Sequence, residues 1–441
     1  MNRLQVLLLL ASVALVPGSA FAQGHMIQGV GPVNGAMGGA GTALPNESLG
    51  ALAFNPALIT EVKGNQLSFS NDFGMDDIQI DTTVGGRTGR AESTKQVTVL
   101  PGFGWMLRDP NKKMALGFGL IGLGGFRSDY KQDDASILFA QPPAGFGRIY
   151  AEYRVTKVPV AFALALTPKL SVGASANVYV GELGVAPLPY KYFDVDAAGN
   201  RWYQSAGKMT NRFAIAAQLG VLYKVNDKVN LGASVTTPQN YKAYSWNSTN
   251  ANPSSRQFGQ ATKVTYDLDG PMVVSFGTGL KLSPKTQVAI DGMFTKYEGV
   301  SGFGGPGGII PATSTPGVSG GSSPGGIVDP FGWKNIWTVK AGVQQHVTAK
   351  LIVRAGYHFS QSPIQSKNVL SATGAPLTTT NQYSFGLGLK MFPFLEADLS
   401  AYMAPRVRVT GPLTTLTGQT IGTLDQSNAR TGAVIGLNFT F

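Results

Sequence analysis

Few residues of this chain have a type and spacing that could carry chemistry. The chain contains no cysteine, which excludes disulfide bonds, thiol nucleophiles and thiolate metal sites. Its three histidines, His25, His346 and His358, are scattered and lack the spacing of a metal-binding motif. Residues 117–122 formally match G-x-G-x-x-G, but they lie in an alternating, strand-like run with no helix after it, so a nucleotide-binding loop is excluded. We therefore expect neither a metal ion nor another cofactor.

A hydrolytic site is the remaining enzymatic alternative. An outer-membrane lipase needs serine and histidine side chains on adjacent strands, and Ser384 and His358 fall on neighbouring candidate strands. No catalytic motif surrounds either residue, so we do not expect an enzyme. The acidic pairs 76–77 and 133–134 could hold calcium near lipopolysaccharide, but we favour solvated loop charges as their explanation.

Three cations fall on the polar side of the C-terminal strands: Lys334, Lys340 and Arg354. A cation facing lipid at mid-membrane would cost about 2–4 kcal/mol, so we expect these side chains to point into the lumen of a barrel. There they could pair with the carboxylate of a ligand. The alternative is that they pair with acids of the chain itself, such as Glu396, Asp398 or Glu47.

The elements that must position these side chains are membrane-spanning strands. Charged residues make up only 13% of the chain, where a soluble domain carries about a quarter. No stretch after residue 22 reaches the roughly 18 consecutive apolar residues of a membrane helix. Instead, apolar side chains alternate with glycine and polar side chains over 351–359, 383–391 and 432–441. This alternation is typical of strands with one face in lipid and the other in a lumen.

The connections between the candidate strands alternate between tight turns and long, polar, Gly- and Pro-rich loops. Long loops such as 125–153, 184–210, 239–271 and 298–334 follow odd-numbered strands. Short periplasmic turns and long outer loops are the signature of an outer-membrane barrel. We therefore predict an all-β fold, a 14-stranded antiparallel transmembrane β-barrel over residues 65–441. The candidate strands are 65–74, 96–107, 113–124, 154–167, 170–183, 211–224, 228–238, 272–282, 286–297, 335–346, 350–360, 381–392, 395–405 and 430–441.

The N-terminal residues do not fit the barrel pattern. Residues 1–22 resemble a signal peptide, with Arg3, an apolar run and a small-x-small end at residues 20–22; the run is too short for the alternative, a membrane anchor. Residues 23–64 are rich in glycine yet carry many apolar side chains. We expect them to form a plug, or hatch, in the lumen rather than a disordered periplasmic tail.

Several motifs resemble those of the FadL-type transporters of long-chain fatty acids. Asn55-Pro56-Ala57 corresponds to the hatch motif of that family. Residues 333–337, 350–357 and 362–364 are similar to its pattern across a late hairpin. The C-terminal segment with Gly436, Phe439 and Phe441 resembles the general signal read by the barrel-assembly machinery. The resemblance covers the mature chain in layout, whereas the outer loops match only in character.

This resemblance implies hydrophobic binding sites that lead to a lateral opening, made by an inward kink of the third strand. Glycines in strands mark bends and bulges, and the third candidate strand contains Gly117, Gly119, Gly122, Gly124 and Gly125. Ordinary barrel packing is the alternative. Aromatic residues of the loop 184–210 could line an entry groove, or they could simply pack the loop. Our candidates for ligand contacts, besides the three cations, are Phe54, Tyr190, Phe193 and Trp202.

These expectations predict passive uptake of a hydrophobic molecule across a bacterial outer membrane. A chain of about fifteen methylenes loses roughly 12 kcal/mol of burial in a wet pore, and a dry pocket with sideways release into lipid avoids that cost. Long-chain fatty acids are the expected cargo, and aromatic hydrocarbons are the alternative on the same fold. A structural or adhesive barrel and a lipase are the alternatives from other classes. We expect a monomer that contacts outer-membrane lipids and lipopolysaccharide and binds no nucleic acid.

Overall fold

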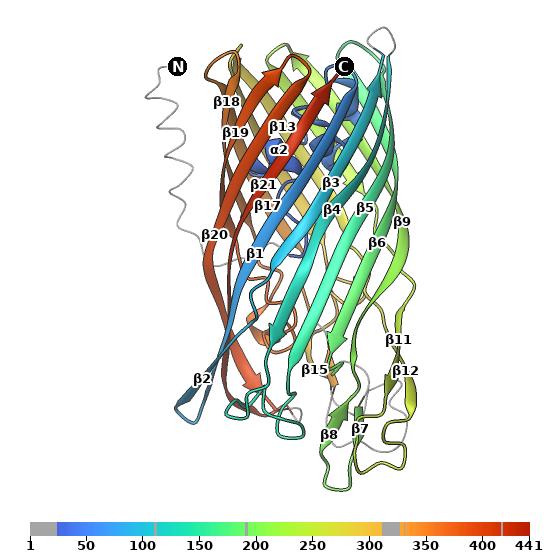
Figure 1. Ribbon diagram of the computed structural model, residues 1–441, viewed down its shortest axis with the longest axis vertical. Helices are drawn as coiled ribbons and strands as arrows, with labels where there is room; N and C mark the ends of the chain where they lie inside the picture. Colours follow the sequence, from blue (N-terminus) through green and yellow to red (C-terminus); the bar gives the residue numbers. More distant parts are fainter. Residues whose placement is uncertain (1–23, 110–112, 190–192, 311–326, 330, 416–417) are drawn as a thin grey trace.

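Fourteen long antiparallel strands close into a barrel (Figure 1). The computed structural model describes residues 24–109, 113–189, 193–310, 327–329, 331–415 and 418–441, so the proposed signal peptide lies outside the described residues. The predicted fold class is confirmed. The barrel strands are β1 (Gln66–Val84), β3 (Val97–Arg108), β4 (Met114–Tyr130), β5 (Ile149–Ala165), β6 (Leu170–Ala186), β9 (Ala206–Asn226), β10 (Val229–Thr236), β13 (Met272–Ser283), β14 (Thr286–Lys296), β17 (Ile336–His346), β18 (Leu351–Ser360), β19 (Asn381–Phe392), β20 (Leu395–Thr414) and β21 (Thr420–Thr440).

Strand β1 closes the barrel because it pairs with the last strand on one side and with β3 on the other. Gln66 lies opposite Thr440 of β21 and opposite Met106 of β3. Several strands extend further outward than the sequence indicated; β1, expected over 65–74, continues to Val84. Its outer end forms a hairpin with β2 (Arg87–Glu92), which among the described strands pairs with β1 alone. The extension escaped prediction because apolar alternation ends where the strand leaves the lipid.

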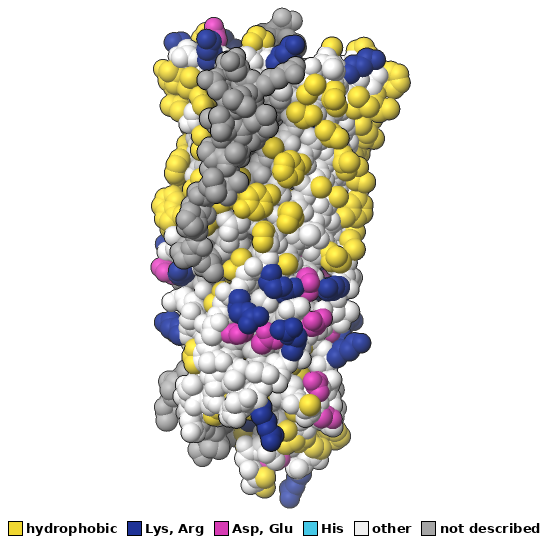
Figure 2. Space-filling view, turned by 90° about the vertical axis from the view of Figure 1, so that its left-hand side faces the viewer, with side chains coloured by type: hydrophobic (Ala, Val, Ile, Leu, Met, Phe, Trp, Pro, Cys, Tyr) yellow, Lys and Arg dark blue, Asp and Glu magenta, His cyan; other side chains and the backbone are white. Residues whose placement is uncertain are grey.

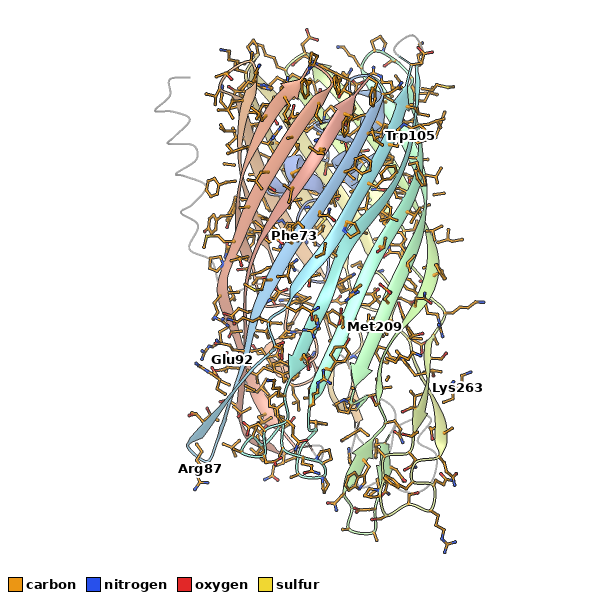
Figure 3. All side chains as sticks on the ribbon, viewed as in Figure 1. Phe73, Arg87, Glu92, Trp105, Met209 and Lys263 are labelled. Carbon is orange, nitrogen blue, oxygen red and sulfur yellow. The ribbon has the colours of Figure 1, made fainter. Side chains whose placement is uncertain are left out.

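A band of apolar side chains surrounds the barrel wall (Figure 2). On β1, Phe69 is 43% exposed whereas its neighbours Ser68 and Ser70 are buried, as expected when one face meets lipid. Exposed Phe73 and Trp105 lie in this band, and Arg87, Glu92 and Lys263 lie beyond its outer edge (Figure 3). Figure 2 shows Lys, Arg, Asp and Glu side chains directly below the apolar band. The apolar band is the part of the wall that fits the hydrocarbon layer.

Short hairpins extend the outer end of the barrel. They are β7 (Phe193–Val195) with β8 (Arg201–Tyr203), β11 (Tyr244–Thr249) with β12 (Ala261–Tyr266), and β15 (Gly308–Ile310) with β16 (Ile327–Asp329). The opposite end carries the tight turns and, in Figure 1, the C-terminus. Across the described ranges, no helix combines the length and apolar character needed to cross a membrane.

The segment before the barrel lies inside it. It contains the helices α2 (Gly31–Ala36) and α3 (Ser48–Phe54) and the 3-10 helix η1 (Pro56–Thr60). Helix α2 contacts β18–β21 and β1, whereas α3 and η1 contact β3, β4 and β5, and Figure 1 shows both α-helices within the end of the barrel that has short turns. The side chains of Leu49, Leu52, Leu58 and Ile59 are fully buried, and each contributes about 1.5–3 kcal/mol of burial. We call residues 24–64 the hatch.

Candidate ligand pathway through the barrel

The hatch motif Asn55-Pro56-Ala57 is fixed by the side chain of its asparagine. The Asn55 amide nitrogen donates to the carbonyl oxygens of Thr42, at 2.8 Å, and of Val221 on β9, at 3.1 Å. Its Oδ1 accepts from the backbone N–H of Ala57 at 3.1 Å, which caps η1. Pro56 is the first residue of η1, where a missing N–H costs no helical hydrogen bond. The motif therefore joins two parts of the hatch to the barrel wall.

Two glycines of the wall allow the motif to approach this closely. Gly173 of β6 and Gly220 of β9 lie directly opposite each other. A Cβ atom on Gly220 would lie 2.0 Å from Asn55 Oδ1, and one on Gly173 would lie 2.5 Å from the nitrogen of Ala57. Sequence reasoning missed this glycine recess because glycine recurs on most inward faces, and nothing in the alternation distinguishes these two.

Arg354 is held by acids of the barrel wall. Its guanidinium donates to Asp398 Oδ1 at 2.6 Å and to Glu396 Oε1 at 2.9 Å, and its side chain is 3% exposed. Asp398 also accepts from Asn438 at 2.9 Å, whereas Glu47 accepts from the backbone N–H of Asn34 at 2.7 Å. Arg354 is thus paired with acids of the chain itself, which was the alternative to pairing with the carboxylate of a ligand.

Lys340 contacts the hatch rather than a wall acid. Its Nζ donates to the carbonyl oxygen of Gln28 at 3.0 Å and lies 4.6 Å from the centre of the Phe54 ring, a favourable cation–π geometry. The structure therefore brings together two of the sequence candidates. Arg354 is opposite Gln344, four positions along β17 from Lys340, or about 13 Å at the rise of a strand. The predicted cations do not form one site.

Lys334 requires a correction. We expected its side chain to point inward by strand alternation, but β17 begins only at Ile336. Lys334 is a half-buried residue of the preceding outer loop, and its backbone N–H donates to the carbonyl oxygen of Pro363 at 3.1 Å. The alternation rule does not apply there, because the residue precedes the strand.

An inner pocket lies between the hatch and the wall. One ammonium group, that of Lys157 on β5, lines it. Lys157 is 1% exposed, and its Nζ donates to the carbonyl oxygens of Leu52 and Ala53 and to Gln218 Oε1, at 3.0, 3.1 and 2.7 Å. Sequence analysis did not single out this lysine, although the alternation that selected Lys340 also places it inward. Its apolar neighbours in the pocket include Phe54, Leu123, Val155 and Met293.

Beside this pocket, strands β3 and β4 stop pairing with each other. Their ladder ends at Gly102 opposite Ile121, whereas β4 continues to pair with β5, with a register shift between Gly122 and Gly124. Pro101, the next residue of β3, has no N–H to donate, as suits an unpaired edge. We call this break the window.

The five glycines predicted to kink the third strand divide into two groups. Gly124 and Gly125 have φ values of +128° and +142°, which only glycine adopts readily, and with Gly122 they surround the register shift. Gly117 and Gly119 lie in the regularly paired part, where a Cβ on Gly117 would lie 2.6 Å from Leu52 of the hatch. The irregularity thus falls at the outer three glycines, while an inner one serves close packing.

The first described residues of the hatch pair with the exposed edge of β4. Met26 bridges Gly124, the N–H of Ile27 donates to Leu123 O at 2.8 Å, and the N–H of Gly125 donates to His25 O at 2.7 Å. His25, Met26 and Leu123 line the inner pocket, whereas Gly124 and Gly125 line a second pocket at the window, together with charged side chains such as Arg154. We call residues 25–27 the partition.

An aromatic cluster holds the partition. The His25 ring stacks on Phe303 with 4.8 Å between ring centres, and its Nδ1 lies 3.0 Å from the hydroxyl oxygen of Tyr297. Phe303 in turn stacks on Trp333 at 4.7 Å. Trp333 begins one of the segments that resemble FadL-type proteins, and here it packs against the N-terminal segment.

The loop expected to line an entry groove contributes only in part. An outer pocket is lined by Leu138, Phe146, Ile149, Val185 and Leu370, among others. Phe193 and Trp202 lie instead in the β7–β8 hairpin: Phe193 stacks under the Arg201 guanidinium at 4.7 Å, and Trp202 Nε1 donates to Asp196 at 3.2 Å. Tyr190 lies outside the described residues.

The remaining candidates have structural surroundings. Phe439 and Phe441 stack at 6.4 Å, and Phe441 is 72% exposed, while a Cβ on Gly436 would lie 2.8 Å from Pro32 of the hatch. The hydroxyl of Ser384 donates to Ala36 O at 3.1 Å, so this serine contacts the hatch. Among the described residues, no cluster of three or more His, Cys, Asp or Glu is arranged to hold a metal ion.

Comparisons with known proteins agree with this architecture. Solved structures with the same fold include the Pseudomonas putida toluene transporter TodX, with a TM-score of 0.67, 18% identity and coverage of 95% of this chain and 100% of that one. A Pseudomonas aeruginosa FadL homologue has a TM-score of 0.71 and 15% identity, with coverage of 95% of this chain and 100% of that one. The Ralstonia pickettii toluene transporter TbuX has a TM-score of 0.64 and 19% identity, with coverage of 94% of this chain and 99% of that one. No curated protein matches the chain. The model of the outer membrane protein transport protein family (OMPP1/FadL/TodX) matches residues 13–441, and the chain therefore belongs to this family of outer-membrane transport proteins.

Proposed function

We propose that this protein takes up long-chain fatty acids passively, by binding them in the inner pocket and releasing them sideways through the window. The observation that carries this proposal is the buried ammonium group of Lys157 in a pocket whose lining combines apolar side chains with uncharged polar ones. A carboxylate is the natural partner of such a group. The aliphatic chain would pack against side chains such as Phe54, Leu123 and Val155, each buried methylene contributing about 0.8 kcal/mol.

The hydrogen-bond partners of Lys157 position its ammonium group so that a ligand carboxylate could replace one of them. In the structure its three donors are satisfied by two hatch carbonyls and by Gln218. An arriving carboxylate would replace a neutral acceptor by a charged one, and hydrogen bonds between ionised partners are about twice as strong. The ligand would thereby exchange a hydrogen bond rather than leave a buried group unpaired.

Aromatic hydrocarbons are the second candidate cargo. The observation in their favour is the ring cluster of His25, Phe303, Trp333 and Tyr297 next to the inner pocket. Aromatic pairs in such clusters contribute about 0.5–1.5 kcal/mol beyond their burial, so a planar apolar ring would be accommodated without any charged group. TodX and TbuX, which share the fold, are toluene transporters.

We further propose how the barrel sits in the membrane. The belt of charged side chains at the outer edge of the apolar band (Figure 2) would meet lipopolysaccharide headgroups. The exposed C-terminal Phe441 would present the signal for the barrel-assembly machinery, and the barrel would act as a monomer.

Binding of oleate and of toluene to purified wild-type protein and to the Lys157→Gln variant tests the cargo. We expect the variant to bind oleate about 10- to 100-fold more weakly, the equivalent of the roughly 1.5–3 kcal/mol of a charged hydrogen bond, and to bind toluene unchanged. Lys263→Gln, at an exposed position of the β11–β12 hairpin, is the matched control. Equal oleate affinity in all three proteins would overturn the role of Lys157. Uptake of labelled oleate and of toluene by a deletion strain then decides the cargo in cells.

A further inference from the structure

The outer connection between β18 and β19 is folded into the barrel. Loops normally run over the surface of a protein, yet every residue from 368 to 380 is buried. This stretch contains no charged residue, and Val369, Ala372 and Ala375 are 0% exposed within the main apolar cluster. In Figure 1 it belongs to the orange chain inside the outer half of the barrel.

This stretch crosses the lumen. The Ser128 hydroxyl of β4 donates to the carbonyl oxygen of Gly374 at 2.8 Å. In the closed order of strands, β4 is six neighbours away from β18, through β19, β20, β21, β1 and β3. Half of a ring of fourteen is seven, so Ser128 stands almost diametrically across from the strand that carries the loop. Leu370 and Gly374 also line the outer pocket together with Ala151 of β5, the next strand along.

Hydrogen bonds to other parts of the barrel hold the stretch in place. Gln426 of β21 donates to Val369 O at 2.5 Å, and Thr378 donates to Val407 O of β20 at 2.7 Å. Asn368 donates to the carbonyl oxygen of Gly332, in the neighbouring outer loop, at 3.0 Å. The chain is thus attached at both ends to its own strands and in between to three other parts of the outer rim.

We propose that residues 368–380 are an outer plug, a second barrier against ions and water-soluble solutes in series with the hatch. A lumen of this strand number would otherwise hold water. An ion that passed this level would have to enter a dry layer of uncharged side chains, which is expensive without a partner. The barrier does not depend on which hydrophobic ligand the inner pocket binds.

Four barrels in planar lipid bilayers test the proposal: the full chain, one without the outer plug, one without the hatch, and one without both. Residues 362–379 can be replaced by a short Gly-Ser linker, because the N–H of Ser360 donates to Thr380 O at 3.0 Å, so the two strand ends are adjacent. We expect the full chain and both single deletions to stay closed to KCl and the double deletion to conduct at least tenfold more. A barrel without the hatch that conducts as well as the double deletion would overturn the outer plug. Removing the exposed loop 253–260 together with the hatch is the matched control and should leave the barrel closed.

A labelling experiment with the hatch intact keeps the proposal testable if the barrel without the hatch does not fold. The chain has no native cysteine, so Gln426→Cys, at a position 0% exposed, would be the single reactive site. A membrane-impermeant maleimide should label it in cells only after the plug is removed. Phe258→Cys, at a position 58% exposed, should react in both backgrounds. Equal labelling of the Gln426→Cys protein with and without the plug contradicts the proposal.

Discussion

The glycine recess under the hatch motif allows one perturbation to be worked out from distances. In a Gly220→Ala variant the new methyl group would lie 2.0 Å from Asn55 Oδ1, which is too close for both to stay in place. The strand ladder of β9 keeps Gly220 where it is, so the hatch motif must move. Asn55 then loses its contacts with Thr42, Val221 and Ala57.

The expected magnitude follows from these contacts. Three hydrogen bonds at about 1 kcal/mol each amount to about 3 kcal/mol, so the population of barrels with an undocked hatch motif should rise on the order of a hundredfold. Hydrogen exchange of the amides of residues 55–60 measures this population directly. Gel mobility before and after heating verifies that the barrel itself is folded. We expect uptake to fall while the barrel remains inserted.

Two further variants make the test specific. Asn55→Ala removes the same contacts from the hatch side, so the double variant with Gly220→Ala should be little worse than either single one, because both act on one interaction. Gly35→Ala is the matched control: a Cβ there would meet its nearest neighbour, Ser400 Oγ, at 3.6 Å, an ordinary contact. If Gly220→Ala exchanged as slowly as Gly35→Ala, the recess would not determine docking of the hatch.

Three other predictions concern the wall, the partition and assembly. Arg354→Met leaves Asp398 buried without its cation, and loss of one partner of a buried pair costs about 3–5 kcal/mol. The temperature at which the folded band disappears on a gel should therefore drop. An unchanged temperature would contradict the role of the pair. Ile27→Pro removes the N–H that donates to Leu123 O. The amides of residues 121–126 should therefore exchange about fivefold faster, as loss of a hydrogen bond worth about 1 kcal/mol implies. Unchanged protection would show that the partition does not cover the window. Phe441→Ala should reduce the amount of folded barrel in membranes without changing the stability of what is inserted, and normal assembly would refute its part in the signal.

The barrel was predictable from sequence because lipid imposes a rule that each strand must obey by itself. A side chain such as Phe69 faces hydrocarbon and its neighbour Ser70 does not, and this alternation is visible in the sequence without knowledge of any other strand. The strand ends are less local, since β1 continues to Val84 after the lipid ends. The inward direction of Lys340 and Arg354 followed from the same rule, which also explains the error at Lys334, a residue outside the strand.

The contacts of the lumen could not be predicted in this way. What Lys157 or Gly220 touches depends on how the hatch packs against the wall, and that packing joins residues more than a hundred positions apart. The outer plug left one local signal, the absence of charge from 368 to 380 in a connection between strands. The absence of charge indicates a buried connection only in combination with the contact of Gly374 to Ser128 on the opposite wall. Alternation reports which face a residue occupies, but it carries no information about its partner.

The distribution of contacts favours a sideways exit over passage along the axis. An axial path toward the periplasm requires undocking of the hatch. Loss of the three hydrogen bonds of Asn55 costs about 3 kcal/mol. Each apolar side chain that becomes exposed, such as Leu52 or Leu58, costs about 1.5–3 kcal/mol more. The window is closed by two backbone hydrogen bonds of the partition, worth about 2 kcal/mol, and by the aromatic cluster that packs on His25. A ligand in the inner pocket contacts His25 and Met26 directly, so its own burial can replace the packing that the partition gives up. The proposed sideways exit therefore requires only the partition to move, whereas an axial exit requires the whole hatch motif to undock.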